Sequence, residues 1–226
     1  MKVNHIWIGS REVPEEYLKN YSKWEDSTIW YEEELLSLCT DQQVTDYMKI
    51  EHLINRINYL KYILMYEKGG IYADLDAWPV KDLNDFFELT KVEGIDKYAK
   101  MSIRYPFNTE IPEKRFGDYD IILPARLTMF FYPNGAKPTL LDNPVLMSKP
   151  KQKFWLKLVE HCMNRQNNKD VPHEPYGPYG MSDFLFTNYY KPYMEGILVL
   201  PFQYLMEAPD KIGKTTYIVH EAKSGW

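Results

Sequence analysis

The chain has 226 residues, of which 45% are hydrophobic and 26% are charged, a composition typical of a globular protein and not of a disordered chain. Its formal charge of -5, without a dense basic run, excludes a general nucleic-acid-binding role. Two distant cysteines, Cys39 and Cys162, exclude a disulfide scaffold and a thiolate zinc site. The absence of repeats and linkers predicts one domain covering residues 1–226.

Hydrophobic runs are too short for a signal peptide or a membrane span. We therefore predict a cytoplasmic protein, whose contact with a membrane, if it has one, would be peripheral.

Strands and helices are predicted to alternate along the first third of the chain. A β-branched strand over residues 3–8 precedes a helix that begins near Pro14, a strand over 28–31 and a helix that begins in the acidic run 32–34. The clearest helix, 50–68, has an apolar face at 3.6-residue spacing and ends at Gly69–Gly70. A strand over 71–76 follows directly, and this order predicts an α/β fold.

The rest of the chain continues this pattern less regularly. The pattern predicts strands at 101–103, 121–123, 127–131, 197–200 and 217–220, helices at 151–164 and 181–190, and a proline-rich loop at 167–180.

Asp74 and Asp76 are the strongest candidates for chemistry. Carboxylates at positions i and i+2 project to the same side of an extended chain, and their repulsion favours a bound cation such as Mn²⁺ or Mg²⁺. They come at the carboxyl end of a predicted strand, where open α/β sheets bind ligands. The alternative interpretation is a solvated strand end.

The segment Lys61 to Asp76, KYILMYEKGGIYADLD, resembles the D-x-D region of glycosyltransferase family 32. Together with His5 to Gly9, HIWIG, it is also similar to the catalytic domain of the large clostridial glucosylating toxins. Further matches are softer or lie at the tail. They are Asn143 within 142–150, the turn 176–178, and the tail residues His220, Glu221, Ser224 and Trp226.

The resemblance implies a single GT-A domain with a mixed central sheet, a divalent metal and retaining transfer from a nucleotide sugar. It implies that Trp7 stacks on the nucleotide base, that Asp74 contacts the ribose or donor sugar, and that Tyr72 lies near the donor. The implied metal ligands are Asp76, Glu221 and Ser224. Ser224 and Trp226 would also contact the phosphates, and Asn143 would act catalytically with Asp74 and Asp76.

The sequence departs from the family pattern upstream of the glycine pair. Asn58 and Lys61 stand where the family has an aspartate that holds sugar hydroxyls and an arginine that holds phosphates. Lys61 keeps the charge without the bidentate fork of arginine, and Asn58 can both donate and accept hydrogen bonds. This leaves the identity of the donor sugar open.

Other polar residues are weaker candidates. We expect His52 and His161 to be packing or surface residues, and His173 to line the acceptor site or to be an ordinary loop residue. Asp183 could have a functional role or could equally cap the helix that it opens.

The sequence thus predicts a metal-dependent retaining glycosyltransferase that moves a hexose from a nucleoside diphosphate sugar to a glycan acceptor, as in polysaccharide synthesis. UDP is the favoured nucleotide of the donor. One alternative is a toxin-like enzyme that glucosylates proteins. The other is a non-catalytic carbohydrate- or nucleotide-binding module, which would bind without metal and release no nucleoside diphosphate.

Overall fold

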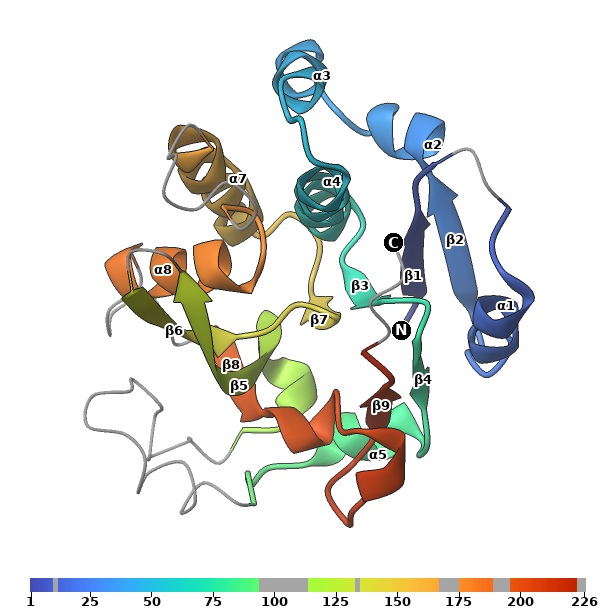
Figure 1. Ribbon diagram of the computed structural model, residues 1–226. Coiled ribbons are helices and arrows are strands. Elements are labelled where there is room, and N and C mark those ends of the chain that lie inside the picture. Colours follow the sequence, from blue (N-terminus) through green and yellow to red (C-terminus); the bar gives the residue numbers. More distant parts are fainter. Residues whose placement is uncertain (10–11, 94–113, 133–134, 167–174, 189–195, 223–226) are drawn as a thin grey trace.

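A mixed seven-stranded sheet organises the computed structural model, which describes residues 1–9, 12–93, 114–132, 135–166, 175–188 and 196–222 (Figure 1). The strand order is β2-β1-β3-β7-β5-β6, with β8 also paired to β5. Strand β1 is parallel to β2 and β3, β8 is parallel to β5, and β7 runs antiparallel between β3 and β5. The strands are β1 Val3–Trp7, β2 Ser27–Tyr31, β3 Gly70–Ala73, β5 Ile121–Tyr132, β6 Gly135–Leu141, β7 Val145–Ser148 and β8 Ile197–Pro201.

A second, two-stranded sheet pairs β4 (Ala77–Pro79) antiparallel with β9 (Ile218–His220). The described helices are α1 Glu15–Tyr21, α2 Glu32–Leu36, α3 Asp41–Met48, α4 Leu53–Glu67, α5 Leu83–Glu88, α7 Lys153–Arg165 and α8 Pro178–Asn188, with 3-10 turns at Phe116–Asp118, Phe202–Tyr204 and Pro209–Lys211.

Neighbouring side chains of the central strands enter two different hydrophobic cores. Tyr72 and Leu146 belong to the core that includes α4, α7 and α8, whereas Ile71 and Met147 belong to the core that includes α5. This alternation follows from the two-residue period of a strand. The central strands are therefore covered on both faces, and Figure 1 shows α4, α7 and α8 together on one side of the sheet.

Two glycines make the turn from α4 into β3. Gly69 has a φ of +60°, and a Cβ atom there would lie 2.5 Å from the backbone nitrogen of Pro150. Gly70 has a φ of +86°, and its Cβ would lie 2.4 Å from the carbonyl oxygen of Lys2. Only glycine accepts both the left-handed backbone and this close approach, so the pair places β3 directly beside β1.

The α/β class and the mixed central sheet predicted from the sequence are confirmed. Helix α3 was not predicted; it begins with a capping box in which the Thr40 hydroxyl and the Gln43 side chain each bond the other residue's backbone N–H. Strand β5 is continuous where two strands were predicted, because a register shift between Ala125 and Thr128 accommodates the irregularity. Helix α8 begins at Pro178, three residues before the prediction, and proline is favourable in a first turn. The predicted strand at 101–103 lies outside the described residues.

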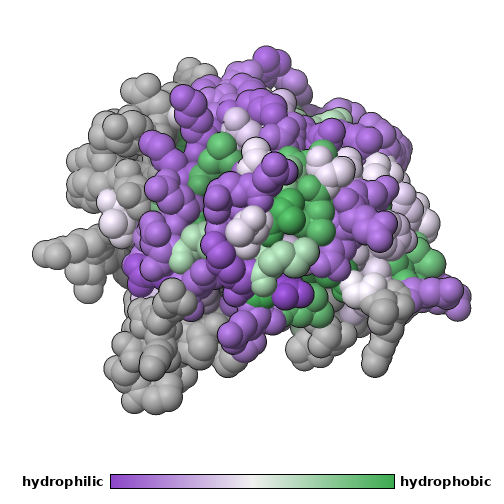
Figure 2. Space-filling model, turned by 90° about the horizontal axis from the view of Figure 1, so that it is seen from above, coloured by the Kyte–Doolittle hydropathy of each residue, from purple (hydrophilic) through white to green (hydrophobic). Residues whose placement is uncertain are grey.

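The face of the molecule seen in Figure 2 is mainly hydrophilic, with a limited apolar area near its centre. Among the described residues, no helix is both long and apolar enough to span a bilayer.

Candidate active site

Asp74 and Asp76 lie in a turn that joins the two sheets. Strand β3 ends at Ala73, and the backbone N–H of Ala77 donates to the carbonyl of Asp74 over 2.9 Å. The expectation that both carboxylates project from an extended strand is therefore wrong in its geometry, because the chain must turn here to enter β4. The turn still brings ligand atoms of Asp74, Asp76 and His220 within 4.8 Å of one another.

His220 reaches this turn through the pairing of β9 with β4. Its Nε2 lies 3.2 Å from Oδ1 of Asp76, and the backbone N–H of the next residue, Glu221, donates to the Asp76 carbonyl over 3.1 Å. Asp76 is buried, with 4% of its surface exposed. Burial alone would lower the pKa of His220, but the hydrogen bond to Asp76 and the charges of Asp74 and Asp76 outweigh it and raise that pKa.

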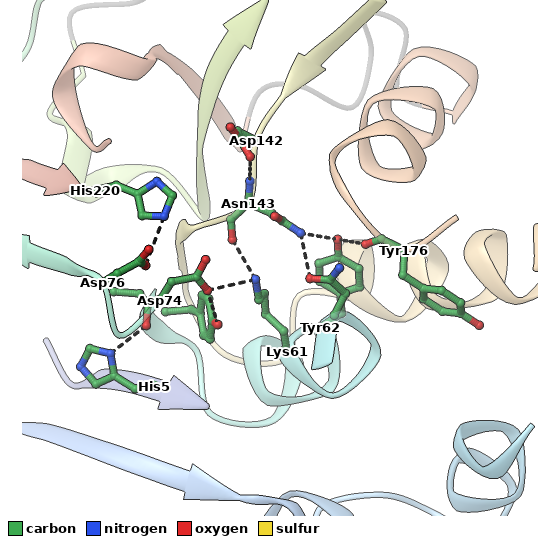
Figure 3. A network of polar contacts seen from close by, with 12 residues as sticks. His5, Lys61, Tyr62, Asp74, Asp76, Asp142, Asn143, Tyr176 and His220 are labelled. Carbon is green, nitrogen blue, oxygen red and sulfur yellow. Dashed lines mark hydrogen bonds and ion pairs between the residues drawn. The ribbon is translucent and has the colours of Figure 1, made fainter. Parts of the chain in front are cut away.

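The carboxylate of Asp74 is held from within the protein (Figure 3). The hydroxyl of Tyr72 donates to its Oδ1 over 2.5 Å, and Nζ of Lys61 lies 3.4 Å from the same atom. The Lys61 ammonium also sits 4.3 Å from the centre of the Tyr72 ring. Burial lowers the pKa of Lys61, and Asp74 opposes this shift. Lys61 thus contacts Asp74 from the interior of the protein, where its positive charge stabilises this carboxylate.

Asn143 is bound through both its main chain and its side chain. Lys61 donates to its carbonyl over 3.0 Å, and its own N–H donates to the Asp142 carboxylate over 2.9 Å. Its Nδ2 donates to Oδ1 of Asn58 over 3.0 Å and lies 3.4 Å from the hydroxyl of Tyr62. The structure therefore brings together Asn58, Lys61, Tyr72, Asp74 and Asn143, all singled out from the sequence.

Trp7 ends β1 at the edge of the sheet where β3 ends, just before Asp74. It is half-buried, with its ring centre 6.1 Å from that of Tyr17. It lines a surface hollow of about 430 Å³ together with Gly9, Tyr31 and the acidic residues 32–34. The hollow is a separate feature from the Asp74 cluster, so a ligand that used both would have to extend along this edge.

Ser224 and Trp226 lie outside the described residues, as does His173. Glu221 is exposed and adjoins Asp76 through the backbone hydrogen bond given above. The contacts of Glu221, Ser224 and Trp226 with a metal or a phosphate therefore stay predictions.

Asp183 lies within α8, so its prediction as a helix cap is wrong because the helix begins five residues earlier, at Pro178. Its carboxylate contacts His161 over 2.9 Å and also pairs with Arg165. His161 is therefore bound between α7 and α8, in agreement with the expected packing role. His52 precedes α4 at its N-cap position.

Several residues of the site were not assigned a role from the sequence. His220 was noted only as part of the tail that resembles the family, without a role at the metal site. Burial lowers the pKa of His5 to about 4, although its contact with the Ala73 carbonyl opposes the shift. The ring is therefore neutral at pH 7, and its Nδ1 donates to that carbonyl over 2.7 Å, just before Asp74. Tyr62 gave no signal, because a tyrosine on an apolar helix face is typical of core.

Comparison with known proteins gives this site its class. Residues 11–93 match the family model described as "Glycosyltransferase sugar-binding region containing DXD motif", and Asp74 and Asp76 lie in the matched segment. This part of the chain is therefore similar to the DXD-containing sugar-binding region of glycosyltransferases, in agreement with the resemblance inferred from the sequence. The match supports a glycosyltransferase enzyme. No curated protein sequence matches.

Solved structures similar to the chain include two glycosyltransferases and the catalytic domain of a toxin. The PaToxG glycosyltransferase is 13% identical with a TM-score of 0.48, over 82% of this chain and 68% of its own. A glycosyltransferase involved in glycosylation of the major capsid of PBCV-1 is 13% identical with a TM-score of 0.43, over 99% of this chain and 95% of its own. The catalytic domain of alpha-toxin from Clostridium novyi is 13% identical with a TM-score of 0.43, over 73% and 57%.

Proposed function

We propose that the chain is a metal-dependent retaining hexosyltransferase that uses a nucleoside diphosphate sugar, with UDP as the favoured nucleotide and a glycan as acceptor. The observation that carries this proposal is the convergence of Asp74 and Asp76, in the turn after β3, with His220 at the end of β9. We propose further that residues 1–226 act as one transferase domain and that the protein works in the cytoplasm.

The residues of the turn fit a divalent ion. Asp76 and His220 are largely buried, and Nδ1 of His220 makes no hydrogen bond with any residue that the structure describes. Two carboxylates together with an imidazole favour Mn²⁺ over Mg²⁺, because Mg²⁺ is bound almost entirely by oxygen ligands. When bound, such an ion would neutralise charge on the departing diphosphate.

The surrounding side chains keep the two carboxylates in different roles. Tyr72 and Lys61 hold Oδ1 of Asp74, which would leave its second oxygen for the ribose or the donor sugar. Asp76 is bound to His220 and to the backbone of Glu221, and we assign it to the metal. The position of Trp7 at the same sheet edge supports a role in stacking on the nucleotide base.

We propose that the donor's anomeric configuration is retained, as the family resemblance implies. The bond between the anomeric carbon and the phosphate oxygen would break while the acceptor oxygen attacks from the same face. The leaving phosphate would take the acceptor's proton. Proton NMR of the first-formed glycoside tests this step, and an inverted product would refute it.

The central experiment is a donor screen. Wild-type protein is incubated with UDP-glucose, UDP-galactose, UDP-N-acetylglucosamine and GDP-mannose in the presence of Mn²⁺, and release of nucleoside diphosphate is measured. We expect turnover with at least one UDP-linked donor, abolished by EDTA and restored by Mn²⁺. A binding module would release no nucleotide, and full turnover in excess EDTA would refute the metal dependence.

A further inference from the structure

A line of buried hydrogen bonds leads from Asn58 through Asn143 and Tyr62 to the main chain of Tyr176 (Figure 3). Asn143 Nδ2 is 3.0 Å from Oδ1 of Asn58 and 3.4 Å from the Tyr62 hydroxyl. The Tyr62 hydroxyl in turn lies 2.5 Å from the carbonyl oxygen of Tyr176. The line joins α4, the segment before β7 and the segment before α8.

The carbonyl of Tyr176 determines the direction of every bond in this line. A carbonyl can only accept, so Tyr62 must donate its single hydroxyl hydrogen to it. The Tyr62 oxygen is then an acceptor, and the nearest atom of Asn143 must be its amino group. The same amide nitrogen of Asn143 also faces the side chain of Asn58. Because this nitrogen can only donate, the atom of Asn58 that it contacts must be the oxygen. The orientations of both amides, which their shapes alone leave ambiguous, follow from one backbone group.

The Tyr62 hydroxyl is held firmly in place. Its ring is completely buried and stacks on Trp155, with centres 5.9 Å apart and an angle of 18° between the planes. The Trp155 indole N–H donates to the Ser148 hydroxyl over 2.9 Å, which fixes the second ring. Burial also raises the pKa of Tyr62, so its hydroxyl stays protonated, and therefore a hydrogen-bond donor, at any physiological pH.

This arrangement determines what Asn143 can offer to a ligand. Its main chain is bound by Lys61 and Asp142, and its amino group is engaged by Asn58 and Tyr62. In the described part of the chain, no residue donates a hydrogen bond to its side-chain oxygen. Asn143 is therefore set up as an acceptor, in a site whose neighbouring lysine also contacts Asp74.

We propose that Tyr62 is a positioning residue for donor-sugar specificity: it locks the Asn143 amide so that its oxygen accepts a hydrogen bond from one hydroxyl of the donor hexose. This inference rests on the proposed hexosyltransferase function. A site built to bond a hydroxyl discriminates strongly against a sugar that lacks it or places it elsewhere. Without the Tyr62 hydroxyl, the Asn143 amide can rotate and present either end.

The test compares Tyr62→Phe with Tyr59→Phe. Tyr59 lies on the same helix, is buried, and also donates its hydroxyl to a backbone carbonyl, that of Gln43, over 3.0 Å. It is outside the line of hydrogen bonds and serves as the matched control. For each protein, kcat/KM is measured with UDP-glucose, UDP-galactose and UDP-N-acetylglucosamine, UDP binding is measured by calorimetry, and the melting temperature is recorded.

We expect the ratio of kcat/KM between the best donor and the next to fall by about tenfold in Tyr62→Phe, with little change in UDP affinity. Tyr59→Phe should keep the wild-type ratio. A folded Tyr62→Phe protein with the wild-type ratio, or an equal loss in both variants, would overturn the inference. A wild-type protein that turns over no donor would instead refute the proposed function, and the inference with it.

A measurement on the wild-type protein keeps the inference testable if Tyr62→Phe does not fold. UDP-hexoses in which one hydroxyl at a time is replaced by fluorine are compared with the parent donor, because fluorine can accept a hydrogen bond but cannot donate one. We expect kcat/KM to fall by about tenfold for the position that Asn143 contacts. If every fluorinated donor has the kcat/KM of its parent, the side-chain oxygen of Asn143 does not accept a hydrogen bond from the donor sugar.

Discussion

The carboxylate of Asp76 and the imidazole of His220 meet at one end of the β4–β9 sheet, 3.2 Å apart, although they lie far apart in the sequence. We expect Asp76→Asn and His220→Ala each to lower kcat by more than about 100-fold, because loss of a metal ligand should exceed the 10–100-fold typical of outer partners. Higher Mn²⁺ concentration should partly restore His220→Ala, which steady-state kinetics across a Mn²⁺ series will show.

Asp120→Asn is the control for this prediction, because Asp120 is a partly exposed carboxylate paired with Lys149 at the surface. Its kcat and Mn²⁺ dependence should match the wild type. Wild-type turnover by Asp76→Asn would argue against the metal site in this turn.

Trp7 provides a test of nucleotide binding. If its ring stacks on the base, Trp7→Ala should weaken the binding of free UDP by about 1–3 kcal/mol, measured by calorimetry. Trp30→Ala is the comparison, since Trp30 lies in the neighbouring strand and donates its indole N–H to Asn4. That change should lower the melting temperature and leave UDP affinity unaltered. A stable Trp7→Ala protein with normal UDP affinity would exclude the stacking role.

His5 should make the protein sensitive to acid. Burial lowers its pKa to about 4 in the folded protein from an ordinary value of 6.5, so the unfolded chain takes up the proton first as the pH falls. The stability that depends on neutral His5 is complete above pH 6.5 and is lost progressively toward pH 4, by about 3 kcal/mol in total. Urea unfolding of wild type and His5→Gln between about pH 4 and pH 8 will measure this, and the variant should lack this part of the pH dependence. Identical pH profiles would contradict it.

Gly69→Ala should destabilise the fold by at least about 2 kcal/mol, because alanine must adopt a positive φ and its Cβ would collide with the backbone near Pro150. Gly213→Ala is the matched control, since the nearest atom to a Cβ there is 3.8 Å away. Denaturant midpoints compare the two. A Gly69→Ala protein as stable as Gly213→Ala would show that the α4–β3 turn tolerates a side chain.

The order of helix, glycine pair, strand and D-x-D could be predicted because it is local. The glycines end α4 and begin β3 within two residues, and periodicity indicates the buried face of α4. The contact of His220 with Asp76 could not be predicted, since it depends on a pairing between two three-residue strands from distant parts of the chain. The polar role of Tyr62 was equally hidden, because its ring packs as core while only its hydroxyl enters the hydrogen-bond line.

The two-stranded β4–β9 sheet links the end of the described chain to the turn that follows β3. A cation held between Asp76 and His220 would therefore act as a removable crosslink between the two strands. By mass action, it would stabilise the folded protein in proportion to the logarithm of its concentration. Metal availability would then govern how firmly the C-terminal strand stays attached, as well as the chemistry of transfer.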